Sequence, residues 1–263
     1  MLPPIDRLYG EKDLSRNPCF AGGFINFGYW AGIDADGPLR EADRVRSQED
    51  LYRLVLRASD IEESSRVVEV GCGRGLGCAL ALREFGPRSV CGVDAHPAQV
   101  ERAVRGNSPL PGALEFRLGT AASLPFPDSS ADRVYSVEAA QHFPSVTEFA
   151  NEAARVLTPG GRLAVSTFFA RQPGRDAEIH ALLQSFEQGL DVAHPISTFT
   201  DALTAAGFSE VSVHSIGEHV WAAYDRWVAS TVHAEDWPRN FLRSYTDGLL
   251  DYYLVTADRP QTD

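Results

Sequence analysis

The chain has 263 residues, of which 44% are hydrophobic and 23% are charged. This composition supplies enough apolar material for a core and argues against disorder, and the length suits one α/β domain with additions or two small domains. The formal net charge of −12 repels phosphate backbones, so we expect no nucleic-acid partner.

The four cysteines form no Cys-x-x-Cys pair, and no histidine cluster joins them. This pattern predicts a reducing cytoplasm and no metal site. Met1 is not followed by a basic segment and an apolar core, and no apolar stretch approaches the length of a membrane span. We therefore expect a cytoplasmic protein without membrane insertion.

The first 43 residues are polar and turn-rich, apart from an aromatic and glycine-rich stretch from Phe20 to Trp30. This stretch could be an arm that simply covers a sheet. Glycine hinges and amphipathic rings equally suit a lid that moves and excludes water from a site. The spacing of apolar residues then predicts a helix over 44–58. Gln48 could reach the site, but a solvated polar face is the preferred interpretation.

A strand, a glycine cluster and a helix follow one another between residues 67 and 86. Val67 to Val70 is a short apolar run, typical of a strand that is buried on both faces. Four glycines between residues 71 and 77 let the backbone turn sharply and approach a ligand. The next apolar run ends at Asp94, roughly 20 residues past the glycines, where a βαβ nucleotide site binds ribose hydroxyls.

Helical and extended patterns alternate through the rest of the chain. A helix starts at Pro97, with an expected buried stripe of Val100, Ala103 and Val104. The remaining expected elements are strands at 114–118, 133–138, 162–168, 211–216 and 250–256, and helices at 146–157 and 199–206. This alternation predicts an α/β fold.

Glu138 to Pro144 follows one of these strands directly. Ligands of open α/β sheets bind beyond the carboxyl ends of the strands, so this segment should face the same crevice as the glycines. His142 is a candidate general base because imidazole titrates near neutral pH. It could instead be a packed residue, and Glu138 could be an acid that complements a helix N-terminus.

Several motifs resemble class I S-adenosylmethionine-dependent methyltransferases of the small-molecule type, such as those acting on sterols, tocopherols and natural products. The Glu-x-Gly-x-Gly-x-Gly run that begins at Glu69 resembles their motif I, whose cofactor carries no phosphate. Asn26-x-Gly-Tyr-Trp resembles their lid, and Gly119 to Asp128 resembles the segment that holds the adenine, with Thr120 in place of the usual acid. The stretch from Glu138 to Pro144 resembles their motif after the fourth strand.

The resemblance implies a doubly wound, Rossmann-like sheet of seven mostly parallel strands that closes with a C-terminal antiparallel hairpin. Residues 1–43 would form the lid or arm and 44–263 the methyltransferase domain, with substrate-side insertions at about 171–196 and 218–247. The second insertion is rich in aromatic residues, which could form either core or an apolar substrate pocket.

The resemblance also implies the site. S-adenosyl-L-methionine would contact Tyr29, Glu69, Gly71, Cys72, Gly73, Gly75, Asp94, Ala95, Thr120, Ala121 and Glu138. Tyr29 and Glu138 would lie near its methionine end, and Glu138 also near the transferred methyl group. His142 and Glu138 would be the catalytic residues.

The expected activity is methyl transfer to a small, largely apolar metabolite, either at oxygen with His142 as base or at carbon with Glu138 stabilising a cation. The carbon acceptor would be terpenoid-like or polyketide-like. Alternatives from other classes are an NAD-dependent oxidoreductase, disfavoured by the glycine pattern, and a non-catalytic cofactor-binding protein. The chain could also form a homodimer.

Overall fold

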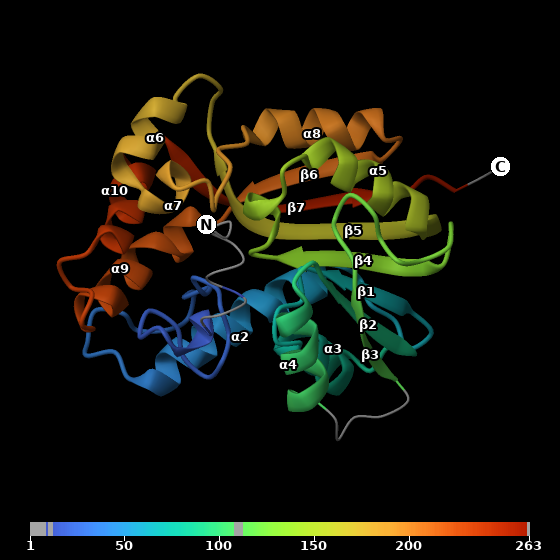
Figure 1. The fold of residues 1–263 in the computed structure, drawn as a ribbon, viewed down its shortest axis with the longest axis horizontal. Helices are drawn as coiled ribbons and strands as arrows, with labels where there is room; N and C mark the ends of the chain where they lie inside the picture. The colour runs from blue at the N-terminus through green and yellow to red at the C-terminus, as the bar shows by residue number, and fades with distance from the viewer. Residues whose placement is uncertain (1–8, 10–12, 108–112, 262–263) are drawn as a thin grey trace.

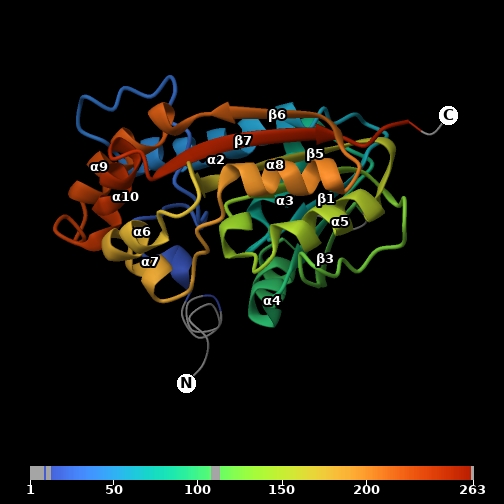
Figure 2. The same ribbon diagram turned by 90° about the horizontal axis from the view of Figure 1, so that it is seen from above.

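The computed structural model describes residues 9, 13–107 and 113–261, which form a seven-stranded sheet with helices on both faces (Figures 1 and 2). The strand order is β3-β2-β1-β4-β5-β7-β6. β7 runs antiparallel to both of its neighbours, and the other pairs are parallel. The expected fold is thereby confirmed. The strands are β1 Arg66–Val70, β2 Ser89–Asp94, β3 Leu114–Leu118, β4 Ala131–Val137, β5 Leu157–Ala170, β6 Ser209–Ser215 and β7 Leu250–Asp258.

The strand order reverses between β1 and β4. From β1 the chain moves outward through β2 to β3, and it then returns to place β4 on the other side of β1. Val68 of β1 consequently pairs with Cys91 of β2 and with Val134 of β4. Ligands of open α/β sheets bind at such a switch point, beyond the carboxyl ends of the strands.

Two helix layers cover the sheet. On one face, α2 (Glu41–Ala58) and α3 (Leu76–Phe85) share a core with β1, and on the other, α5 (Val146–Val156) and α8 (Ile196–Ala205) do so. Helix α4 (Pro97–Gly106) packs beside β2 and β3. The short 3₁₀ helices are η2 Leu14–Arg16, η3 Ala140–His142, η4 Gly217–His219 and η5 Trp237–Arg239.

Four further helices gather at one end of the sheet, on the left in both views (Figures 1 and 2). They are α6 Asp176–Leu182, α7 Gln184–Glu187, α9 Trp221–Ala229 and α10 Asn240–Thr246. Aromatic side chains of α9 and α10 pack against Phe27, whose ring centroid lies 4.5 Å from that of Tyr224 and 4.8 Å from that of Phe241. Residues on either side of Phe27 are also buried. We call the cluster of Phe27, Phe168, Trp221, Tyr224 and Phe241 the wall. Its packing is that of an arm that covers the sheet, and its movement as a lid stays a prediction.

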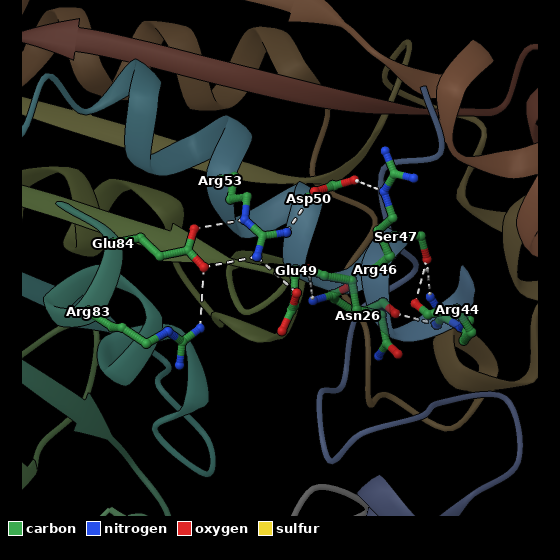
Figure 3. Close-up of polar contacts among 10 residues, drawn as sticks. Asn26, Arg44, Arg46, Ser47, Glu49, Asp50, Arg53, Arg83 and Glu84 are labelled. Atoms are coloured by element: carbon green, nitrogen blue, oxygen red, sulfur yellow. Dashed lines mark hydrogen bonds and ion pairs between the residues drawn. The ribbon is translucent and has the colours of Figure 1, made fainter. Parts of the chain in front are cut away.

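Helix α2 anchors the segment that carries Phe27 to the rest of the molecule (Figure 3). The guanidinium of Arg44 is fully buried and donates to the carbonyls of Cys19 and Asn26. On another side of the same helix, Arg53 reaches Glu84 of α3 at 2.8 Å and also pairs with Glu49 and Asp50. One helix therefore holds both the wall and α3.

Two burial expectations are wrong. Gln48 is fully buried, because its amide accepts from the backbone N–H of Ala21 at 3.1 Å and donates to the carbonyl of Phe24 at 2.9 Å. Val104 is 52% exposed, since α4 turns Gln99 and Ala103 inward instead. In both cases the helical spacing predicted the helix correctly, but packing against other segments decided which face of the helix is buried.

Candidate active site

A cavity of about 660 Å³ opens at the carboxyl ends of β1, β2, β3 and β4, within the size range of small-molecule sites. We call the residues that follow these strands the strand-end side. It comprises Val70 to Arg74, Asp94 to His96, Gly119 to Ala122, and Val137 to Ala139 with His142 to Ser145. The arm side comprises Tyr9, Gly23, Phe24, Ile25, Gly189, Leu190 and Val192.

The glycine loop brings backbone close to the cavity. Gly73 has φ +52, and a Cβ there would meet nothing nearer than the Gln99 amide at 3.8 Å. Gly75 has φ +74, and a Cβ there would overlap the Phe116 ring at 2.4 Å. The loop thus leaves an open cradle at Gly73 while packing tightly behind it, which suits a nucleoside lying on the backbone.

Asp94 is fixed against this loop. Its carboxylate accepts from the N–H of Gly73 and from that of His96, both at 2.9 Å. Burial raises the pKa of Asp94, and these two N–H groups partly offset the effect. A carboxylate has about four acceptor positions, so two remain for a pair of ribose hydroxyls. Ala95, Thr120 and Ala121 line the cavity nearby, as does Cys72.

Three expected cofactor contacts, Glu69, Gly75 and Tyr29, lie outside the described lining. Glu69 is fully buried and lies outside the described lining, because strand alternation turns it towards α2 and α3. There it accepts from the hydroxyls of Tyr52 at 3.1 Å and Tyr135 at 2.9 Å, and burial raises its pKa to about 7. Tyr29 also lies outside the described lining, with its ring edge-on to His219 at 5.3 Å.

Glu138 lies in the cavity, directly after β4. Its backbone is left-handed with φ +46, a conformation that is uncommon for non-glycine residues and that recurs at active sites. One carboxylate oxygen accepts from the N–H of Phe27 and from the Tyr252 hydroxyl. Burial raises the pKa of Glu138 to about 7, against the lowering effect of these donors. The carboxylate thus connects the wall to the sheet.

His142 is paired with an acid that sequence reasoning missed. Its Nδ1 lies 2.9 Å from Asp191 Oδ1 and 3.0 Å from the Leu190 carbonyl, and its Nε2 lies 3.0 Å from the Tyr9 hydroxyl. Both neighbours of Nδ1 only accept, so Nδ1 carries the proton and Nε2 of the neutral ring is the acceptor. The sequence held no signal for Asp191, which comes from the loop after α7.

The pair also shifts the imidazole. Burial lowers the pKa of His142, but the hydrogen bond and the charge of Asp191 raise it more, so it lies above its ordinary value of 6.5. The arrangement is that of a general base in the cavity lining, held in one tautomer and orientation by a carboxylate, with Nε2 as its unprotonated nitrogen.

The aromatic residues of 218–247 do not line this cavity within the part of the chain that the structure describes. Trp221, Tyr224 and Phe241 are buried in the core around Phe27, so of the two interpretations the core is correct.

The described residues also contain no group of three or more His, Cys, Asp or Glu side chains arranged to hold a metal, and among them no helix is long and apolar enough to cross a membrane.

Residues 68–165 match the family model of the methyltransferase domain. The chain is 34% identical over 220 residues to the erythromycin 3''-O-methyltransferase of Saccharopolyspora erythraea, covering 79% of this chain and 69% of that protein. It is 38% identical over 139 residues to the fatty-acid O-methyltransferase of Mycolicibacterium smegmatis, covering 52% of this chain and 50% of the relative.

The fold is also that of a solved methyltransferase. Geranyl diphosphate C-methyltransferase from Streptomyces coelicolor, in complex with Mg²⁺, geranyl diphosphate and S-adenosyl-L-homocysteine, superimposes with a TM-score of 0.80. The match covers 97% of this chain and 96% of that one at 20% identity, which establishes a shared architecture alone.

Proposed function

Since this chain belongs to the S-adenosylmethionine-dependent methyltransferases, we propose that it methylates a hydroxyl oxygen of a small, largely apolar metabolite, with His142 as the general base. The observation that carries this proposal is the His142–Asp191 pair: His142 lines the cavity, and its Nε2 lies 3.0 Å from the hydroxyl of Tyr9, another lining residue. A base of this kind is required when the nucleophile is a neutral hydroxyl.

The lining of the cavity supports the acceptor class. Phe24, Ile25, Leu190 and Val192 give the arm side an apolar surface. The erythromycin and fatty-acid relatives are both O-methyltransferases by name. A polar group on a largely apolar body is what an apolar surface beside a base would select.

The residues in and around the cavity have different roles in this reaction. When bound, S-adenosylmethionine supplies a methyl group that leaves its sulfur as the new C–O bond forms. The glycine loop and Asp94 hold the nucleoside, and the wall around Phe27 excludes water. His142 Nε2 takes the proton of the hydroxyl, and Asp191 stabilises the imidazolium that results. Glu138 keeps the wall against the sheet.

Methylation at carbon is the second candidate, supported by the position of Glu138 in the cavity and by the architecture shared with the geranyl diphosphate enzyme. The charges weigh against a diphosphate acceptor. Among the described lining residues Arg74 is the only guanidinium, and it is already bound to Ser15 at 2.5 Å and near Asp13. Two carboxylates, Asp94 and Glu138, face the same space.

The test is a transfer assay with methyl-labelled S-adenosylmethionine and a panel of phenols, alicyclic alcohols and hydroxy fatty acids. Each acceptor is paired with its own methyl ether, in which the hydroxyl is already capped. We expect label in hydroxyl compounds and none in the ethers. Label at a carbon atom of a capped compound would contradict oxygen transfer and favour the role of Glu138 in stabilising a cation.

A further inference from the structure

We propose that Tyr9 occupies the acceptor subsite, so that its phenol marks where the hydroxyl-bearing ring of the acceptor binds and must be displaced by it. This inference rests on the proposed function, because it uses His142 as the base. It adds a substrate class, compounds with a hydroxyl on a six-membered ring, and a residue that competes with them.

The first observation is the hydrogen bond. His142 has Nδ1 committed to Asp191 and Leu190, so a hydroxyl can donate only to Nε2, which also lies 3.3 Å from the Gln141 amide nitrogen. The Tyr9 hydroxyl lies there, at 3.0 Å. An acceptor hydroxyl needs the same atom at the same kind of distance for its proton to be taken.

The second observation is the chemistry of the contact. The Tyr9 ring meets the imidazole edge-on, with centroids 5.6 Å apart. Burial raises the pKa of Tyr9, as do the carboxylates of Asp191, Glu138 and Asp94, so the phenol stays protonated and donates. The site therefore accommodates a neutral aromatic hydroxyl, and a carboxylate-bearing ring would meet three negative charges.

The third observation is how Tyr9 is held. It lines the cavity but belongs to neither cluster of buried core residues. The backbone carbonyl of Tyr9 accepts a hydrogen bond from Arg102. In η2, which follows in the sequence, the Ser15 hydroxyl accepts one from Arg74. Polar contacts of this kind exchange for water at little net cost, whereas the wall around Phe27 would lose buried aromatic surface. We therefore expect an acceptor to displace the Tyr9 side chain from the cavity without disrupting the wall.

The experiment uses 4-methylphenol, which is the side chain of tyrosine as a free molecule. Its binding is measured by calorimetry to the unaltered protein, to Tyr9→Ala and to Tyr29→Ala, a matched control that removes the same phenol outside the cavity. We expect Tyr9→Ala to bind it about tenfold or more tightly than the other two, since it no longer competes with a tethered hydrogen-bonded ring. The capped analogue 4-methylanisole should bind Tyr9→Ala more weakly. Equal affinity in all three proteins would overturn the proposal.

Tyr9→Phe keeps the ring and guards against misfolding of the smaller variant. With 4-methylphenol as acceptor, we expect its KM to fall by about two- to tenfold with kcat unchanged, because only the competing hydroxyl is lost. A lower kcat at unchanged KM would instead make Tyr9 a proton relay and overturn the proposal. Binding and transfer also separate the two hypotheses: tight binding by Tyr9→Ala without any methyl transfer contradicts His142 as base and leaves the subsite standing.

Discussion

The two sides of the cavity are built by different means. On the strand-end side, the groups that would hold the cofactor lie within a few residues of β1, β2, β3 and β4, and the backbone N–H of Gly73 holds the Asp94 carboxylate in place. On the arm side, Tyr9, Phe24 and Leu190 come from segments far apart in the sequence and meet through packing alone.

This difference suggests a division of labour. Backbone geometry set by a strand and a glycine turn suits a ligand that never changes. Side chains from loops can vary without disturbing the sheet, so they suit the part of the site that selects an acceptor. Changes on the strand-end side should therefore affect every acceptor equally, and changes on the arm side should depend on the acceptor or on stability.

The largest expected effect is on His142, where the two sides meet. His142→Gln keeps hydrogen bonding but cannot take a proton, so turnover should fall by about 10²–10⁴-fold. Cofactor affinity, measured by calorimetry, should stay nearly unchanged because we propose that the glycine loop and Asp94, and not His142, hold the nucleoside. Full turnover in a folded His142→Gln protein would show that His142 is not the general base and would favour carbon methylation with Glu138 stabilising a cation.

Phe27→Ala tests whether the wall is fixed. Its side chain is 7% exposed among the rings of Tyr224, Phe241 and Phe168. Truncating a buried phenylalanine costs about 3–5 kcal/mol, measured as the free energy of unfolding in urea. Val232→Ala, at a side chain that is 81% exposed, should change it by less than about 0.5 kcal/mol. A small loss for Phe27→Ala would favour the moving lid.

Asp94→Ala sharpens the comparison from the strand-end side. Losing a charged acceptor costs about 1.5–3 kcal/mol, so the cofactor should bind roughly ten- to a hundredfold more weakly with every acceptor. Asp128→Ala, at an acid whose side chain is 79% exposed, is the control and should leave binding unchanged. An unaltered dissociation constant in Asp94→Ala would remove this residue from the ribose site.

The smallest expected change is a shift of the pH profile. His142 accepts a proton only when neutral, so the rate should rise with pH through a pKa above 6.5. Asp191→Asn removes the charge that raises this pKa while burial still lowers it, so the inflection should move to lower pH. Measuring kcat/KM from pH 5 to pH 9 in both proteins checks the direction. An inflection at the same pH would separate Asp191 from the base.

The predictions from sequence succeeded where chemistry is local. The glycine cluster after β1 and the acid that ends β2 follow a pattern in which spacing alone fixes geometry, and Gly71, Gly73 and Asp94 line the cavity. The same reasoning failed for Gln48 and Val104, since a helical period does not say which neighbour will cover each face. It also gave Glu69 to the cofactor, although alternation along the strand turns that residue the other way.

The sequence by itself determined the sheet, the glycine loop with Asp94, and the placement of His142 beyond a strand end, because these depend on short-range periodicity and turn chemistry. The tertiary structure alone decided that Asp191 holds His142, that Glu138 binds the Phe27 N–H, and that Tyr9 lies on the base. Each of these pairs joins segments with no fixed spacing, so only the packing of the whole chain selects the partner.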